Sequence, residues 1–194
     1  IGINASKGKW ICFLDSDDWW YPKKLETCLS FLEEYDIIYH DLHVFSNKGR
    51  SFLGHRKSRK ISKAPFEDLV LNGNILSNST VVVRKSIVDK VGCISEDKKL
   101  IAVEDYDFLI RISLVTDKFG YISKFLGAYF WDENSSNISF SNSQVEKNRY
   151  LLDKYLNLLS DKNSIEAEIR YTYRKARLYQ VLNQKTMAIE SVMK

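Results

Sequence analysis

Several classes of protein are excluded by residues that this sequence has in small number or lacks. Three cysteines occur among 194 residues, and Cys12, Cys28 and Cys93 lie scattered within apolar patterns. An odd, dispersed set does not suit a disulfide framework, so we expect reduced thiols in the core of a cytoplasmic protein. The sequence also lacks an uninterrupted apolar run near the roughly 20 residues that a helix needs to cross a bilayer.

The charge balance and composition indicate an ordinary globular core. A net charge of +4 is too small to indicate a nucleic-acid partner, so we expect none. With 44% apolar and 13% aromatic residues, the chain is long enough to bury one sizeable core. We find no internal repeat and no long linker in the sequence.

The stretch Trp10-Ile-Cys-Phe-Leu-Asp-Ser-Asp-Asp-Trp-Trp-Tyr-Pro22 joins an apolar run to a cluster of carboxylates. The run has the composition of a buried strand, and Asp15, Asp17 and Asp18 follow it directly. Carboxylates this close repel one another, so a fold that gathers them usually supplies a cation or a proton to share. Because ligands of open α/β sheets bind beyond the carboxyl ends of strands, we expect a Mg²⁺ or Mn²⁺ site completed by ligand phosphates.

The rest of the chain alternates between strand and helix patterns. Strands are expected at 10–14, 36–45, 79–84, 119–122 and 125–131, and helices at 22–34, 65–71, 85–91 and 103–112. Gly73 and Gly92 are expected to end the helices before them. The Ser- and Asn-rich segment 132–144 is expected to be a flexible loop, and helical periodicity follows it to the end.

One segment concentrates positive charge. Between residues 48 and 63 there is no acidic side chain and there are seven basic ones, which are Lys48, Arg50, Arg56, Lys57, Arg59, Lys60 and Lys63. A solvated, mobile loop is the simplest interpretation of this pattern. The alternative is a contact with phosphate groups, either on a charged acceptor or on an anionic membrane face.

A second acidic group opens the expected helix at 103–112. Glu104, Asp105 and Asp107 fall in its first turn, where the helix dipole favours negative charge. Taken alone, this pattern indicates an ordinary helix start and no catalytic role.

Two blocks of residues together resemble the family 2 glycosyltransferases of the GT-A fold. The first block comprises Asn4, Ala5, Gly8, the run from Phe13 to Asp18, Trp20, Pro22 and Leu25. The second comprises Ser77 to Thr80, Arg84 to Ser86, Val91, Gly92, Glu96, Glu104 to Asp107, and Arg111. The resemblance implies an α/β three-layer sandwich with a mixed sheet over 1–142, and it leaves 143–194 as a helical C-terminal extension.

The resemblance also implies roles for particular residues. Asp15 and Asp17 match the family's D-x-D motif, which holds a divalent metal, Mn²⁺ or Mg²⁺, and the nucleotide sugar, with Asp18 as an adjacent helper. Asp105, the second acid of Glu104-Asp105, matches the base that takes a proton from the acceptor hydroxyl. These roles imply a single displacement with inversion, which needs one base and no covalent intermediate.

Substrates and setting follow from the same resemblance. The expected donor is a nucleotide-diphosphate sugar, with a UDP-sugar first among the candidates, and the expected acceptor is a saccharide or lipid-linked saccharide. Bacterial polysaccharide or glycolipid synthesis in the cytoplasm is the expected setting. The basic segment offers a means of peripheral attachment to the inner face of the plasma membrane.

The chain departs from the family pattern in two places. Where family members often carry Arg and His after the strand near Tyr129, this chain has Phe130, Trp131 and Asp132. The family's first βαβ units also have no counterpart before Ile1, so we expect a truncated catalytic domain. We therefore expect the 194 residues alone to bind nucleotide poorly, and appreciable sugar transfer by them would contradict this expectation.

Two other functions remain open at this stage. A haloacid-dehalogenase-like phosphohydrolase also places Asp-x-Asp after an apolar strand, although Trp19 replaces its usual Thr or Val and Pro22 opens a helix too early. Hydrolysis of a generic phosphate ester with Mg²⁺ would favour that family. The other alternative is a non-catalytic, metal-stabilised binding or scaffold domain that acts through its C-terminal helices.

Overall fold

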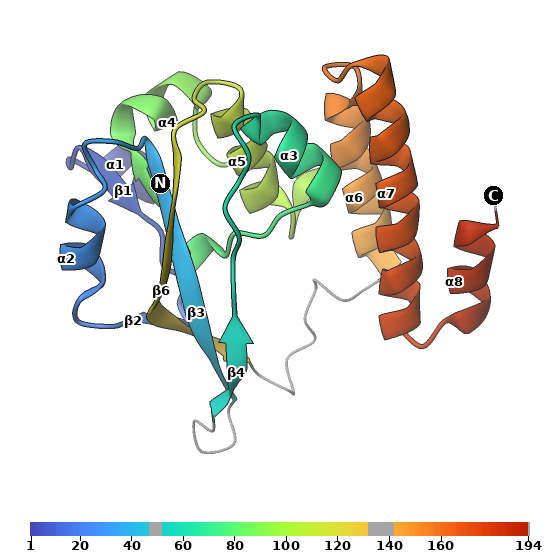
Figure 1. Ribbon diagram of the computed structural model, residues 1–194, viewed down its shortest axis with the longest axis horizontal. Coiled ribbons are helices and arrows are strands. Elements are labelled where there is room, and N and C mark those ends of the chain that lie inside the picture. Colours follow the sequence, from blue (N-terminus) through green and yellow to red (C-terminus); the bar gives the residue numbers. More distant parts are fainter. Residues whose placement is uncertain (47–51, 132–141, 194) are drawn as a thin grey trace. The chain divides into compact units, whose positions relative to one another are not determined.

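The structure is a computed structural model that describes residues 1–46, 52–131 and 142–193. Its strands are β1 (Trp10–Cys12), β2 (Trp19–Trp20), β3 (Ile37–Ser46), β4 (Phe52–Arg56), β5 (Val82–Arg84) and β6 (Phe119–Trp131). Its α-helices are α1 (Gly2–Ala5), α2 (Lys24–Leu29), α3 (Pro65–Asn72), α4 (Lys85–Val91), α5 (Glu104–Ser113), α6 (Asn142–Leu156), α7 (Asp161–Val181) and α8 (Lys185–Val192). Two 3₁₀ turns, η1 (Asn78–Thr80) and η2 (Lys98–Leu100), complete the described elements (Figure 1).

The strands form one mixed sheet in the order β1-β5-β3-β6-β2, with β4 paired to β3. The long strands β3 and β6 run parallel and side by side, whereas the other pairs are antiparallel (Figure 1). This mixed sheet with helices confirms the expected α/β class and is consistent with the GT-A fold.

The chain divides into two compact units. The first comprises Ile1–Pro65, Ile75–Cys93 and Arg111–Ser135 and contains the sheet. The second comprises Phe66–Asn74, Ile94–Ile110 and Ser136–Lys194 and contains the C-terminal helices. The units are discontinuous in sequence, so the domain boundary expected between residues 142 and 143 stays a prediction.

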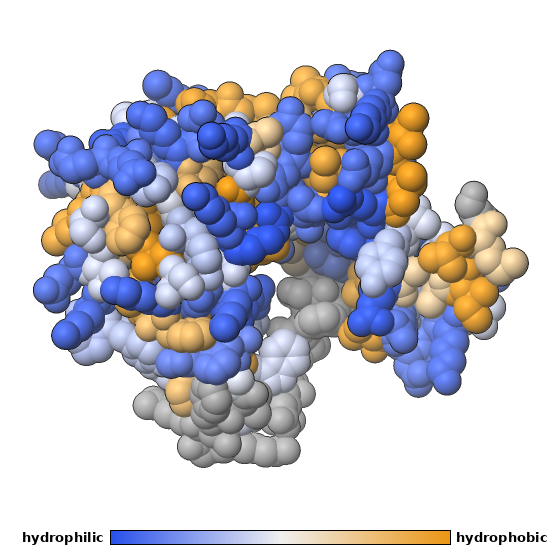
Figure 2. All heavy atoms as spheres, viewed as in Figure 1, coloured by the Kyte–Doolittle hydropathy of each residue, from blue (hydrophilic) through white to orange (hydrophobic). Residues whose placement is uncertain are grey.

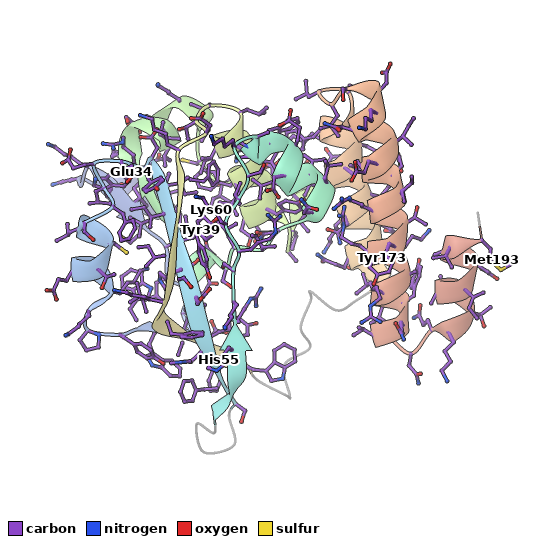
Figure 3. The ribbon with its side chains drawn as sticks, viewed as in Figure 1. Glu34, Tyr39, His55, Lys60, Tyr173 and Met193 are labelled. Carbon is purple, nitrogen blue, oxygen red and sulfur yellow. The ribbon has the colours of Figure 1, made fainter. Side chains whose placement is uncertain are left out.

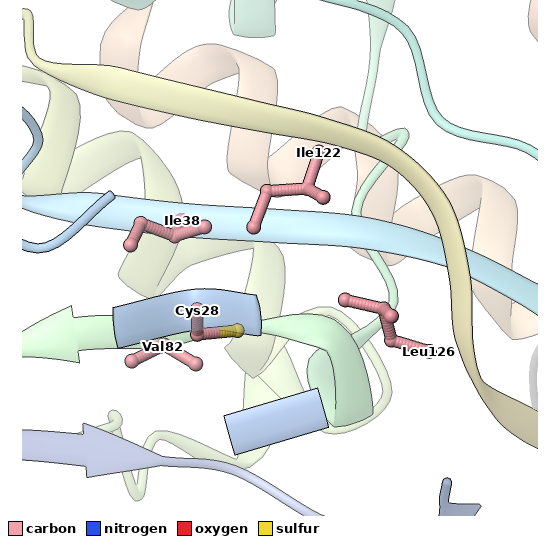
Figure 4. Packing of buried hydrophobic residues seen from close by; sticks show 5 residues of the cluster. All are labelled: Cys28, Ile38, Val82, Ile122 and Leu126. Carbon is pink, nitrogen blue, oxygen red and sulfur yellow. The ribbon is translucent and has the colours of Figure 1, made fainter. Parts of the chain in front are cut away.

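The core of the first unit joins α2 to the sheet. Cys28, Ile38, Val82, Ile122 and Leu126 are each at most 6% exposed and come from α2, β3, β5 and β6 (Figure 4). Removing such side chains from water stabilises the fold by about 1.5–3 kcal/mol for a fully buried Val, Leu or Ile. This packing fixes α2 against the sheet.

The expectation that all three thiols lie in the core is wrong for one of them. The cysteines are free; Cys28 is buried and Cys12 is half-buried, but Cys93 is exposed. Cys93 follows the glycine that ends α4, where the chain lies at the surface, and its Sγ donates a hydrogen bond to Asn4 Oδ1 at 3.2 Å.

Several expected element bounds also need correction. The helix α2 occupies 24–29 and not 22–34, because the chain continues in irregular turns after Leu29. The two strands expected at 119–122 and 125–131 are one strand, β6, whose register with β3 shifts near Asp41. Residues 132–141 of the expected flexible loop lie outside the described residues, and α6 already covers 142–144.

The expected solvated loop is wrong for residues 52–56 of the basic segment, whereas residues 57–63 form no helix or strand and expose Lys57, Lys60 and Lys63. Residues 52–56 form β4, which pairs with β3, while Lys48 and Arg50 lie outside the described residues. The next stretch is fastened to β3, because the Tyr39 hydroxyl donates to the Arg59 carbonyl at 2.8 Å and accepts from the Ile61 N–H at 2.9 Å. Tyr39, Lys60 and His55 of β4 mark this region in Figure 3.

The C-terminal helices carry apolar side chains at their surface. Ile165, Ile169 and Tyr173 follow one another at four-residue spacing on α7 and are each more than 60% exposed, and Figure 2 shows hydrophobic residues on the surface of these helices. Within residues 1–46, 52–131 and 142–193, no helix has both the length and the hydropathy to cross a membrane.

A glycine controls how closely β2 approaches β6. A Cβ at Gly127 would lie 2.8 Å from the Trp19 carbonyl oxygen and 3.1 Å from Leu42 Cδ2. We expect Gly127→Ala to lower the free energy of unfolding by about 1–3 kcal/mol, because a backbone strand must shift to make room. Chemical denaturation measures this. Gly2→Ala is the control, since its Cβ would meet nothing within 4 Å, and an equal loss in both variants would contradict the argument.

Candidate functional site

The acidic cluster lies in the loop between β1 and β2. Asp15 and Asp17 are exposed there, whereas Asp18 is only 8% exposed. The Asp18 N–H donates to the Asp15 carbonyl at 3.2 Å, which closes a tight turn and gathers the three carboxylates. The strand that precedes the acids is shorter than expected, because β1 ends at Cys12 and Phe13 and Leu14 connect it to Asp15.

A neighbouring 3₁₀ turn holds the first carboxylate of the loop. In η1, Asn78 Nδ2 donates to Asp15 Oδ1 at 2.7 Å, and Ser79 Oγ accepts from the Asp15 N–H at 3.0 Å. The Asp15 backbone and side chain are thus both fixed by residues more than sixty positions away. Such contacts restrict the carboxylate to one orientation before any ligand arrives.

The third carboxylate is directed into the protein. Asp18 Oδ1 accepts from the Phe130 N–H of β6 at 3.0 Å, while Oδ2 is buried with no hydrogen-bond partner of ordinary geometry among the described residues. Burial raises the pKa of the Asp18 carboxyl; the nearby Ser79 hydroxyl and the Phe130 N–H lower it, and the charges of Asp17 and Asp15 raise it. Asp18 therefore ties the loop to β6 and leaves Asp15 and Asp17 as the solvent-facing acids.

The raised pKa of Asp18 predicts how stability responds to its replacement. The folded state binds this proton more tightly than the unfolded state, so the contribution of Asp18 to stability is largest below about pH 4 and is lost as the pH rises through the raised pKa. At neutral pH we expect the free energy of unfolding of Asp18→Asn to lie between the wild-type value and a value about 1 kcal/mol higher, because the amide carries no charge to bury.

Asp18→Ala is the matched comparison for this effect. It loses the acceptor for the Phe130 N–H and is expected to destabilise the protein by about 1–3 kcal/mol at the same pH. Urea denaturation of both variants across acidic and neutral pH measures the difference. An Asn variant as unstable as the Ala variant at neutral pH would contradict the role assigned to burial of the charge.

A tyrosine and an arginine flank the acidic cluster. Burial raises the pKa of Tyr129 on β6, the charges of Asp18 and Asp17 raise it further, and Arg56 lowers it. The Arg56 guanidinium carbon lies 4.9 Å from the centre of the Tyr129 ring. One member of the basic segment therefore lies at the edge of the acidic site, on a strand that the sequence analysis did not predict.

The arrangement of donors limits which metal sites are possible. Among the described residues, no group of three or more His, Cys, Asp or Glu side chains could hold a metal ion. Mg²⁺ in proteins is often held by one or two carboxylates together with substrate phosphates. The exposed oxygens of Asp15 and Asp17 fit a hard cation shared with a phosphate-bearing ligand, and they do not form a complete metal centre.

The second expected acid pair lies in the other compact unit, at the start of α5. Asp105 Oδ1 accepts from the Tyr106 N–H at 2.7 Å, and Asn74 Nδ2 lies 3.5 Å from Asp105 Oδ2. Glu104 Oε2 is buried without a hydrogen-bond partner in the described part of the chain. Both carboxylates are half-buried and lie in the first turn of the helix.

Contacts within the second unit fix the orientation of α5. Asp107 is fully buried; it forms an ion pair with Lys154 at 2.6 Å and accepts from the Tyr155 hydroxyl at 2.8 Å. The Tyr106 hydroxyl donates to the Leu69 carbonyl of α3 at 2.6 Å, and burial raises the pKa of Tyr106. These bonds hold the helix that carries Asp105, and they assign Asp107 a structural role.

The structure thus assembles each half of the expected site separately. Asp15, Asp17 and Asp18 lie together in the first unit, and Glu104 and Asp105 lie together in the second. Their union in one reaction centre stays a prediction. The sequence analysis did not assign roles to Asn78, Ser79 and the Phe130 N–H. Asn78 and Ser79 do lie within the segment Ser77–Thr80 that carries the family resemblance.

Comparison with known proteins relates the first 92 residues to a known family. Residues 1–92 match the family model described as Glycosyl transferase family 2. An uncharacterised glycosyltransferase of Methanocaldococcus jannaschii is 28% identical over 130 residues, which is 66% of this chain and 43% of that protein. An uncharacterised glycosyltransferase of Haemophilus influenzae is 31% identical over 117 residues, 58% of this chain and 38% of that protein.

A third relative has a more specific name. The amylovoran biosynthesis glycosyltransferase AmsB of Erwinia amylovora is 28% identical over 137 residues, 66% of this chain and 44% of that protein. The chain therefore spans about two fifths of the length of these curated relatives. The family match covers the acidic loop, α2 and η1 together. Residues 1–92 of this chain are therefore similar to glycosyl transferase family 2.

Proposed function

We propose that the protein containing this chain transfers a sugar from a nucleotide-diphosphate sugar to an acceptor hydroxyl, with inversion at the anomeric carbon. The observation that supports this proposal best is the acidic loop. Asp15 and Asp17 face solvent at the end of a strand, while bonds from Asn78, Ser79 and Phe130 hold the loop in place. The similarity of residues 1–92 to glycosyl transferase family 2 supports the same reaction class.

In this proposal the chain's residues divide the work between donor and acceptor. Asp15 and Asp17 would hold Mn²⁺ or Mg²⁺ together with the donor diphosphate, and Asp18 keeps the loop bound to β6. When bound there, the metal would supply positive charge that neutralises the departing nucleoside diphosphate. Asp105 accepts the proton of the attacking hydroxyl, with Glu104 beside it at the start of α5.

The finer identity of substrates and setting is also a proposal. A UDP-sugar is the first donor to test, and a saccharide or lipid-linked saccharide is the acceptor class. The name of the Erwinia amylovora relative supports a role in polysaccharide synthesis. A reaction in the cytoplasm, at the inner face of the plasma membrane, is a separate part of the proposal.

Peripheral membrane contact is proposed to run through the basic segment. Replacing Arg56, Lys57, Arg59 and Lys60 by Ser is expected to weaken binding to anionic vesicles, because each surface cation contributes about 1 kcal/mol. Sedimentation with phosphatidylserine vesicles measures this. A matched variant with four Lys residues of other regions replaced, Lys7, Lys118, Lys162 and Lys185, controls for net charge, and equal binding by both variants would remove the proposal.

A thermal stabilisation screen tests the donor class. The complete protein is heated with a panel of nucleotide sugars, with Mn²⁺ or with a chelator. Stabilisation by UDP-sugars in the presence of Mn²⁺, lost with the chelator, is the expected result, because a ligand that binds the folded state raises its melting temperature. Equal stabilisation with the chelator would contradict a metal-held diphosphate.

A further inference from the structure

A buried lysine lies beneath the acidic loop. Lys24, the first residue of α2, is 0% exposed, and no carboxylate among the described residues lies within ion-pair distance of its Nζ. An isolated ammonium in the interior costs free energy because the protein replaces its hydration poorly. A fold that keeps this cation without a counter-ion therefore needs another reason for its presence.

The contacts of Lys24 converge on one backbone carbonyl. Lys24 Nζ donates to the Ser79 carbonyl at 3.2 Å and lies 3.7 Å from the centroid of the Trp20 ring. Trp20 Nε1 donates to the same carbonyl at 2.8 Å. The Ser79 carbonyl thus accepts two hydrogen bonds, and the Lys24 ammonium lies on the face of the Trp20 indole. These contacts join α2, β2 and η1.

The same serine connects this group to the carboxylates. Ser79 Oγ accepts from the Asp15 N–H, and its neighbour Asn78 binds the Asp15 carboxylate. Lys24 therefore contacts the acidic loop through Ser79 on one side and through Trp20, which follows the acids in sequence, on the other. Both ends of the loop depend on one buried side chain.

We propose that Lys24 is a positioning residue for donor binding, which fixes Ser79 and Trp20 and through them the carboxylates that take the metal-bound diphosphate. This inference rests on the proposed function of the acidic loop. Lys24 touches neither the donor nor the metal in this account. Its effect on binding passes entirely through Ser79 and Trp20.

The surroundings of Lys24 give this role a recognisable pH dependence. Burial lowers the pKa of Lys24 to about 8. The titratable groups that face it are Cys12 of β1, Cys28 of α2 and His40 of β3; burial raises the pKa of both thiols and lowers that of His40 to about 4. Between neutral pH and about pH 9, Lys24 is the member of this group that changes charge.

Loss of that charge should affect binding and stability in opposite directions. The neutral amine is no longer attracted to the Trp20 ring, so the loop loosens and donor affinity falls above about pH 8. The free energy of unfolding changes in the other direction. Because Lys24 keeps its proton to higher pH in the unfolded state than in the folded state, the free energy of unfolding rises as the pH increases through about 8. A lysine with a purely structural role would move the melting temperature without moving the affinity.

Calorimetric titration of the complete protein with UDP and Mn²⁺ tests the proposal. Lys24→Met keeps an unbranched apolar stem, and we expect it to raise the Kd about tenfold at neutral pH and to abolish the rise of Kd toward pH 9. Lys23→Met, on the exposed preceding residue, is the control and should bind as wild type does, with the same pH profile.

Ser79→Ala keeps the test decisive if the Met variant does not fold. It retains the carbonyl that Lys24 binds but removes the acceptor for the Asp15 N–H, so we expect weaker binding with the pH profile preserved. Wild-type affinity in Ser79→Ala, or in a folded Lys24→Met variant, would overturn this inference and leave the proposed function intact. Failure of the wild-type protein to bind UDP with Mn²⁺ would overturn both.

Discussion

Replacing Asp105 by Asn in the complete protein is expected to lower kcat for sugar transfer by at least about a hundredfold, which is the usual contribution of a general base. The amide cannot accept the proton of the acceptor hydroxyl. It keeps the size of the carboxylate and can still accept from the Tyr106 N–H, so the start of α5 should stay folded. The Kd for UDP with Mn²⁺ should remain within about twofold of wild type, because Asp15 and Asp17, and not Asp105, are proposed to bind the donor.

A matched control separates chemistry from the general effect of losing an acid at a helix start. Asp161 is exposed in the first turn of α7, so Asp161→Asn changes the charge in the same helical position without touching the proposed site. It should transfer sugar at the wild-type rate. An Asp105→Asn variant that is equally active would show that another group takes the proton.

Replacing Asp15 and Asp17 together by Asn is expected to weaken Mn²⁺-dependent binding of UDP by about a hundredfold or more. Loss of groups that only support metal ligands costs about 10- to 100-fold in affinity, and loss of the ligands themselves should cost at least as much. Stability should change little in comparison, because both side chains face solvent. Calorimetric titration with UDP, with and without Mn²⁺, measures the affinity.

The charge of the double variant needs its own control. Asp89→Asn with Asp117→Asn removes two exposed carboxylates from elsewhere in the first unit and changes the net charge equally. This control should bind UDP and Mn²⁺ as wild type does. Equal weakening in both double variants would point to long-range electrostatics and against direct ligation by Asp15 and Asp17.

Local signals in the sequence predicted the features that depend on neighbouring residues. Gly73 and Gly92 end α3 and α4 with φ values of 82° and 79°, a conformation that residues with a Cβ rarely adopt. The exposed carboxylates after β1 were predictable for a similar reason, since an apolar run that ends in acids brings those acids to the surface. Periodicity likewise located β3 and α5 within about two residues.

Features that depend on distant segments could not be predicted in this way. Lys24 and Ser79 are 55 positions apart, and nothing near Lys24 in the sequence shows that a lysine in an amphipathic helix will be fully buried. The burial of Asp18 depends on the Phe130 N–H, 112 positions away. Strand β4 was missed because it lies within a segment whose many basic residues are typical of a solvated loop, and its pairing with β3 outweighs that preference.

Release of nucleoside diphosphate by the complete protein tests the central proposal most directly. The protein is incubated with UDP-sugars and saccharide acceptors, and UDP and the glycosylated acceptor are quantified together. We expect equal amounts of the two products, dependent on Mn²⁺ and lost in the Asp15→Asn, Asp17→Asn double variant. Release that continues unchanged in that variant, or with a chelator present, would contradict the proposal.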